Sequence, residues 1–181
     1  MTLEGVVSSI RAPHWAWRIS KYDPLLRDAA GVYHGDEWTF AAQVGTVVGG
    51  HRLELAEYLA MEDKYVSLTL RFVVESGISS LWVENLQNRF TKKALKQAKH
   101  GLAHPFEDGA HIRDRDLLTG EAIERACRLN LREFLYCDLC EPNRFSLHFG
   151  WDYYLYITSV FPCPESLRYA HDLGLFVEDI H

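Results

Sequence analysis

Acid–base and metal-binding residue types are concentrated between residues 100 and 116, where three histidines and four carboxylates occur. Such groups can supply general acid–base catalysis or ligands for a divalent metal ion. The candidate catalytic residues are His104, His111, Asp108 and Asp114. No established metal-ligand spacing occurs among them, and Gly101 and Pro105 would disturb a helix carrying paired histidines. The sequence therefore favours a polar surface loop, with a small hydrolase or nuclease as the enzymatic alternative.

A second candidate is the CxxC motif formed by Cys137 and Cys140. A structural zinc site needs four ligands, so this pair would require two more, with His148 or Cys163 as candidates. The strand expected here places Cys137 and Cys140 on opposite faces, which is poor geometry for a shared metal. We expect free thiols that are buried or half-buried on a strand, with no metal and no cofactor.

Residues 145–157 carry the strongest pattern in the chain, because every odd position is apolar or aromatic. This period of two predicts a β-strand whose odd face lies in the core. The even face contains the candidate binding residues His148, Asp152, Tyr154 and Tyr156. Such tyrosine-rich faces are typical of protein interfaces, although helices covering this face are an equal alternative. Because usual strands span roughly 5–6 residues, Gly150 predicts a bulge or a second hairpin.

A further candidate is a basic amphipathic helix expected over residues 89–100. Its positive charges form a candidate basic patch of Arg89, Lys92, Lys93, Lys96 and Lys99. Such a patch could contact phosphate or nucleic acid, but a charged stripe on a helix is usually its solvated face. Nucleic acid is therefore a weaker expectation than a protein partner.

The elements that must position these residues alternate between strands and helices. We predict strands at 15–20, 78–86, 133–140, 145–157 (interrupted at Gly150) and 175–177, a short helix at 39–44, and longer helices at 53–76, 89–100, 119–132 and 165–173. Thr119 is the expected N-cap of its helix. Strands clustered after intervening helices predict an α+β fold with a mostly antiparallel or mixed sheet, a C-terminal β-meander and helices packed on it.

Composition limits the classes of protein to consider. At 181 residues the chain is expected to form a single domain over residues 1–181. Its 48% hydrophobic content is typical of a folded protein, and its formal net charge of −6 disfavours a nucleic-acid partner. Because the N-terminus shows no signal-peptide pattern and no stretch approaches a membrane span, we expect a cytoplasmic protein that does not contact a membrane.

The run HFGWDYYLYI, at 148–157, followed by GLFVE, at 174–178, resembles the C-terminal half of small bacterial proteins, some of which are similar to the immunity proteins that neutralise polymorphic toxins. The resemblance covers about a fifth of the chain and carries over no functional residue. It implies an immunity-type toxin inhibitor. The acidic net charge, the aromatic strand faces and the lack of a recognisable catalytic motif favour a non-enzymatic bacterial protein whose partner is another protein. The alternatives are a small hydrolase or nuclease using the 100–116 loop, and a protein that contacts phosphate or nucleic acid through the basic helix 89–100.

Overall fold

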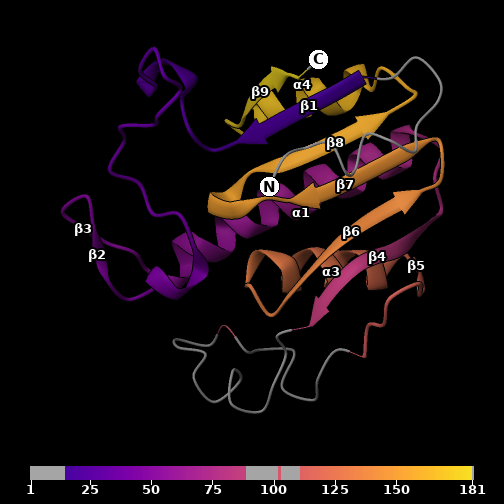
Figure 1. The fold of residues 1–181 in the computed structure, drawn as a ribbon. Coiled ribbons are helices and arrows are strands. Elements are labelled where there is room, and N and C mark those ends of the chain that lie inside the picture. Colours follow the sequence, from indigo (N-terminus) through magenta and orange to yellow (C-terminus); the bar gives the residue numbers. More distant parts are fainter. Residues whose placement is uncertain (1–14, 89–101, 103–110, 181) are drawn as a thin grey trace.

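The computed structural model describes residues 15–88, 102 and 111–180, and it confirms an α+β fold. These residues form a seven-stranded antiparallel sheet, a small hairpin and three α-helices (Figure 1). The strands are β1 (Trp15–Ser20), β2 (Val47–Val48), β3 (His51–Arg52), β4 (Ser80–Asn88), β5 (Leu117–Thr119), β6 (Leu135–Glu141), β7 (Phe145–Phe149), β8 (Leu155–Ser159) and β9 (Phe176–Asp179). The helices are α1 (Leu55–Glu75), α3 (Glu121–Leu131) and α4 (Pro164–Asp172), and the 3-10 turns are η3 (Pro24–Leu26), η4 (Ala41–Gln43) and η5 (Trp151–Tyr153).

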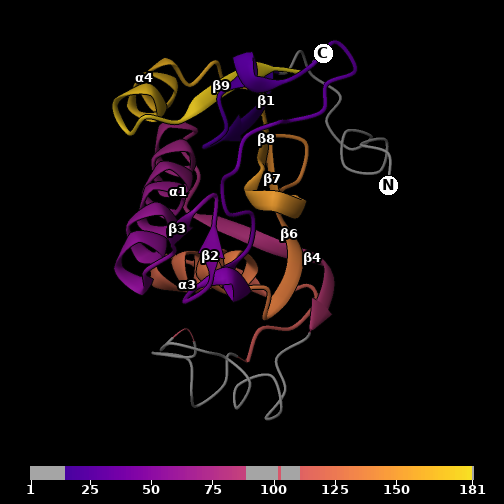
Figure 2. The ribbon, with the colours of Figure 1, turned by 90° about the vertical axis from the view of Figure 1, so that its left-hand side faces the viewer.

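The register of the sheet separates its two faces. The strand order is β5-β4-β6-β7-β8-β1-β9, and directly paired residues share a face. One row of such pairs is wholly buried and apolar: Leu139, Leu147, Ile157 and Trp17. Figure 2 shows α1, α3 and α4 together on one side of the sheet. The core therefore lies between this face and the helices, and the opposite face carries no described helix.

The long helix α1 is the centre of the core because its apolar residues recur at helical spacing. Tyr65, Leu68 and Phe72 on its inner face are fully buried. The helix ends before Gly77, whose positive φ of 63° allows the chain to leave the helix, as its sequence position predicts. None of the described helices is both long and apolar enough to cross a membrane.

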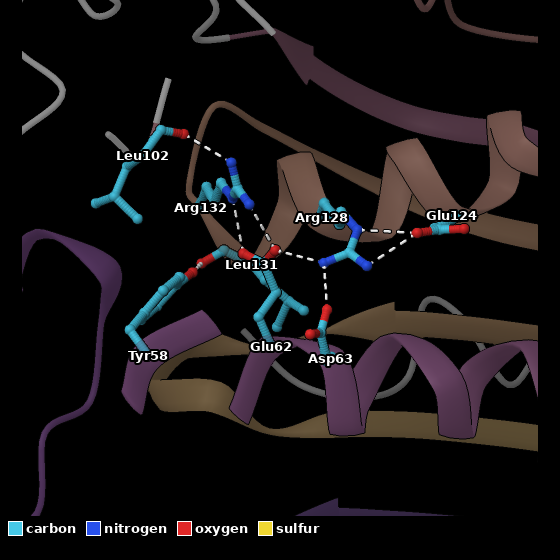
Figure 3. A network of polar contacts seen from close by, with 8 residues as sticks. All are labelled: Tyr58, Glu62, Asp63, Leu102, Glu124, Arg128, Leu131 and Arg132. Atoms are coloured by element: carbon cyan, nitrogen blue, oxygen red, sulfur yellow. Dashed lines mark hydrogen bonds and ion pairs between the residues drawn. The ribbon is translucent and has the colours of Figure 1, made fainter. Parts of the chain in front are cut away.

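A buried ionic network joins α1 to α3 (Figure 3). The Glu62 carboxylate is fully buried and accepts hydrogen bonds at 2.7 Å from both Nε and Nη2 of Arg132. Arg128 Nη1 donates to the same carboxylate at 2.8 Å and also to Asp63 at 2.7 Å. Arg132 Nη1 in addition donates to the carbonyl of Leu102 at 2.8 Å. The network fixes the angle between the two helices through directional, charge-assisted bonds.

Most of the predicted helices and strands are confirmed. The differences fall in segments too short to show a helical or strand period in their hydrophobic residues. Thr119 is not the N-cap that its residue type suggests, because it ends strand β5 and Gly120 precedes α3. Strand β5 and the β2–β3 hairpin were not predicted, and residues 39–44 form only the short turn η4. The expected helix 89–100 lies outside the described residues.

Candidate functional site

The open face of the sheet carries a row of polar side chains across six strands. Sheet register places its members directly beside one another, and we call it the polar row: Glu84, Asp138, His148, Tyr156, Arg18 and Glu178. Glu84 is exposed and the other five are half-buried. The next row on this face holds the exposed Trp82 on β4, followed by small side chains that are buried: Cys140, Ser146, Thr158 and Ala16. Most of the charged groups that the register brings together on this face therefore belong to the polar row.

At the centre of the polar row, the His148 ring stacks on Tyr156. Their ring centroids lie 4.7 Å apart and the planes differ by 10°. Burial lowers the pKa of His148, and the opposing attraction of the neighbouring Asp138 carboxylate does not cancel this effect. The imidazole is therefore neutral at pH 7, and together with Tyr156 it presents a flat aromatic surface.

The β1–β9 end of the row is cationic and held by a shared carboxylate. Arg18 binds both Glu178 oxygens, with Nε and Nη2 at 3.2 and 2.9 Å, and Arg27 Nη1 binds Glu178 at 2.5 Å. Burial opposes ionisation of Glu178, but the two guanidinium groups outweigh it and lower the pKa of this carboxyl. The Tyr154 ring centre lies 5.5 Å from Arg18 Cζ and 5.9 Å from Arg27 Cζ. The two arginines and one glutamate leave a net positive charge here.

Turn η5, between β7 and β8, presents a tryptophan beside the polar row. The Trp151 side chain is 63% exposed and its ring lies 5.1 Å from Tyr136, on the open face of β6. Asp152 and Tyr153 have φ angles of 61° and 64°, a left-handed conformation that residues with side chains rarely adopt. Two successive residues in this region store strain that the surrounding structure must offset.

Contacts between Tyr153 and buried aromatic side chains hold turn η5 in this strained conformation. Tyr153 points into the core, where its ring lies 4.9 Å from Trp38, 5.3 Å from Tyr65 and 6.0 Å from Tyr58. The Tyr65 hydroxyl also donates a hydrogen bond of 2.7 Å to the Tyr153 carbonyl. Because these core contacts fix Tyr153, the neighbouring Trp151 is held outward in a defined position. Its side chain therefore loses less conformational entropy when it contacts a partner.

Three of the four predicted binding residues come together on the open face. His148 and Tyr156 are stacked neighbours, and the Tyr154 ring lies 6.3 Å from Tyr156. Asp152 is exposed in turn η5, outside the strand register. The alternative that helices cover this face is wrong for the described helices. The expectation that every odd position of 145–157 is in the core is wrong for Trp151, because η5 interrupts the period of two.

The structure describes only two of the candidate residues for catalysis and none of those for nucleic-acid binding. His111 and Asp114 are exposed, and Asp114 Oδ1 accepts a 3.2 Å hydrogen bond from the Leu86 backbone, which ties the segment to β4. His104 and Asp108 lie outside the described residues. So does the whole basic patch of Arg89, Lys92, Lys93, Lys96 and Lys99. The catalytic and phosphate-binding hypotheses therefore remain predictions.

The polar row itself lacks an activated nucleophile. Ser146 lies on the same face as His148 and Asp138, but its buried Oγ has no hydrogen-bond partner, whereas covalent catalysis by a serine needs its hydroxyl in contact with a general base. Burial raises the pKa of the Cys140 thiol to about 12, so the thiol is protonated at pH 7. Neither Ser146 nor Cys140, in the described part of this face, is therefore activated as a nucleophile.

The CxxC cysteines lie on opposite faces, as the strand pattern predicts. Cys137 points to the helices, where Asn130 contacts it, whereas Cys140 belongs to the open face. Burial raises the pKa of Cys137 to about 11. Within residues 15–88 and 111–180, no three His, Cys, Asp or Glu side chains are grouped so as to hold a metal ion.

Sequence reasoning missed the residues that complete the surface. Arg18 and Glu178 pair across β1 and β9, and Arg27 reaches Glu178 from a loop, so only the tertiary fold joins them. The even position of Arg18 in its strand was the one available signal. No protein-family model, curated protein or solved structure matches the chain. Function is therefore inferred from the chemistry of this surface.

Proposed function

We propose that the chain is a non-enzymatic protein-binding domain that holds its partner on the polar row and on Trp151. One observation carries this proposal. On the sheet face opposite the described helices, turn η5 exposes Trp151 beside the stacked His148 and Tyr156 rings and the charged groups of the polar row, while the strained turn is held by the buried Tyr153. In the narrower form, the domain is a bacterial inhibitor of the immunity type that blocks a toxin by binding it.

The residue types of this surface support a contact role. Tryptophan, tyrosine and arginine contribute most of the energy of protein interfaces, because they provide rigid area with polar tips. Trp151, Tyr156 and Arg18 supply one of each along a single face. A surface that is already ordered loses little conformational entropy on binding.

The charges on the surface indicate the kind of partner. Glu84 is exposed beside the half-buried Asp138, Asp152 is exposed in turn η5, and the chain carries a formal net charge of −6. Complementary charges raise the rate of encounter and disfavour the wrong partners. We infer that the partner presents a basic surface to the Glu84–Asp138 end of the row.

The experiment compares surface variants in a purified pair. Tagged protein captures the partner from the source organism, and calorimetry then measures the dissociation constant with Trp151→Ala and with Glu84→Lys. Loss of a central tryptophan typically costs about 2–4 kcal/mol, a rise of roughly 30-fold or more in the dissociation constant. Glu84→Lys lowers the association rate and changes its salt dependence.

Matched controls come from outside the surface. Trp15 is another exposed tryptophan, at the start of β1 on the helix side, and Asp172 is an exposed acid on α4. Trp15→Ala and Asp172→Lys leave binding unchanged. If Tyr154→Ala combined with Tyr156→Ala bound as tightly as the wild type while the fold was retained, the surface assignment would be wrong.

The inhibitor role is tested separately from the surface. The captured partner is assayed for toxic activity in cells and in solution, with and without an equimolar amount of this protein. Inhibition that Trp151→Ala weakens supports the immunity-type role. Binding without any inhibition would reject that role and leave the protein-binding function in place.

A further inference from the structure

A pocket away from the polar row lies between the β2–β3 hairpin and the start of α1. It has a volume of about 290 Å³. Its apolar lining comes from Trp38, Val48, Leu53 and Met61, and its charged lining from Lys21, Asp36, Glu37, His51 and Glu57. Small-molecule sites combine such apolar walls with a few convergent polar groups.

Lys21 is the unusual member of this lining. Its side chain is only 3% exposed, and the Nζ atom lies 3.0 Å from Glu37 Oε2. The same atom lies 4.3 Å from the ring centres of both Tyr22 and Trp38. Burial lowers the pKa of Lys21, and the Glu37 carboxylate only partly offsets this. A lysine desolvated among aromatic rings is one of the ways in which proteins activate an amine as a nucleophile.

The hairpin backbone approaches the segment that carries Asp36 very closely on one side of the pocket. An added Cβ at Gly49 would lie 2.4 Å from the Asp36 carbonyl oxygen, so the hairpin can approach this segment only with glycine at position 49. A lysine that served only to tie the loop to β1 would need no cavity beside it. The pocket and the buried amine together therefore indicate a site for a molecule.

We propose that Lys21 is an imine-forming lysine, whose amine condenses with a small aldehyde or ketone that enters this pocket. Glu37, at hydrogen-bond distance, accepts a proton from the ammonium group, and the neutral amine then attacks the carbonyl carbon. A C–N bond forms as the π bond of the carbonyl breaks, and the oxygen takes a proton from the attacking nitrogen to become a hydroxyl. The proton held by Glu37 then joins that hydroxyl, the C–O bond breaks, and water leaves. The product is a protonated imine, and no oxidant or reductant takes part.

The lining defines the class of carbonyl compound. The volume corresponds to about ten water molecules, which suits a ligand of roughly ten non-hydrogen atoms. Trp38 and Met61 favour an apolar body. Asp36 and Glu57 surround the pocket with negative charge, which disfavours a carbonyl compound carrying a carboxylate. The expected ligand is a small, uncharged or cationic aldehyde or ketone.

The test traps the imine by reduction. The full chain is incubated with butanal and cyanoborohydride at pH 7, and peptide mass spectrometry measures the labelling rate of each lysine. Lys64, whose Nζ donates to the Leu173 carbonyl at 2.7 Å, is the internal control. Lys21 is expected to be labelled faster than Lys64, because burial lowers the pKa of Lys21 and so raises the neutral, nucleophilic fraction of its amine. Glyoxylate, which carries a carboxylate, is expected to label Lys21 more slowly than butanal.

A pocket-filling variant separates this site from ordinary lysine reactivity. Val48 is half-buried on the hairpin, and Val48→Trp fills the cavity without altering Lys21. It is expected to lower labelling of Lys21 at least to the rate of Lys64, and to leave Lys64 unchanged, with circular dichroism confirming the fold. Equal labelling of Lys21 and Lys64 in the wild type, or fast labelling of Lys21 that Val48→Trp does not reduce, would overturn the proposal.

Discussion

Removal of the buried Glu62 carboxylate is expected to destabilise the protein strongly. In Glu62→Leu, Arg132 loses two bonds of 2.7 Å, and its side chain is only 4% exposed, so water cannot replace them. Arg128 loses one bond but keeps Asp63 and Glu124 as partners. Breaking a buried ion pair by removing one partner costs about 3–5 kcal/mol, and most of this cost arises at Arg132. For a chain of this size, the melting temperature falls by roughly 6–20 °C.

Urea denaturation followed by circular dichroism measures the free energy of unfolding, with the slope m as a check that the two-state model holds. Asp63→Ala is the matched control, since Asp63 contacts the same Arg128 but is 63% exposed, and such surface pairs contribute about 0–1 kcal/mol. Glu62→Leu combined with Arg132→Leu is expected to recover much of the loss, because no unpaired charge stays buried. A loss below about 1 kcal/mol for Glu62→Leu alone would refute this account of the network.

Three further predictions concern a cap, a titration and a close contact. Glu75→Ala removes the carboxylate that accepts hydrogen bonds from the first backbone amides of α4, so the free energy of unfolding falls by about 1–2 kcal/mol in a urea titration; an unchanged midpoint would contradict this. Since burial lowers the pKa of His148 in the folded state, the unfolded chain binds the proton first, and stability falls as the pH drops below the ordinary histidine pKa of about 6.5. His148→Gln is expected to flatten this slope, and an equal slope in the variant would assign it to other groups. Gly150→Ala places a Cβ 2.7 Å from Tyr156 Cε2, so the ring must move, and weaker partner binding with a small stability loss is expected; wild-type affinity would show that the ring position is unimportant.

The fold was predictable where a regular pattern coincides with a buried face. The helix expected at 53–76 and the strand at 15–20 correspond to α1 and β1, because their apolar residues recur with the helical or strand period. Strand β5 has three residues, too few for any period to be visible. Its pairing with β4 comes from tertiary contact, so it was not predictable.

The candidate surface was predictable in part. Alternation along 145–157 correctly separated His148 and Tyr156 from the core, but it assigned Trp151 to the core as well. The departure arises because turn η5 interrupts the alternation at Trp151, and the odd positions return to the core from Tyr153 onward. The left-handed backbone of Asp152 and Tyr153 in this turn is not predictable from their residue types. The pairing of Arg18 with Glu178 joins residues 160 positions apart.

The sequence by itself determined the α+β class, the α1 core and the polar character of one face of strands β7 and β8, because these follow from local periodicity. Tertiary structure alone decided that the described helices α1, α3 and α4 all lie on the other face, that Trp151 turns outward, and that Lys21 is buried beside a pocket. These features depend on which distant segments come into contact, and that follows from the packing of the whole core and not from any local pattern.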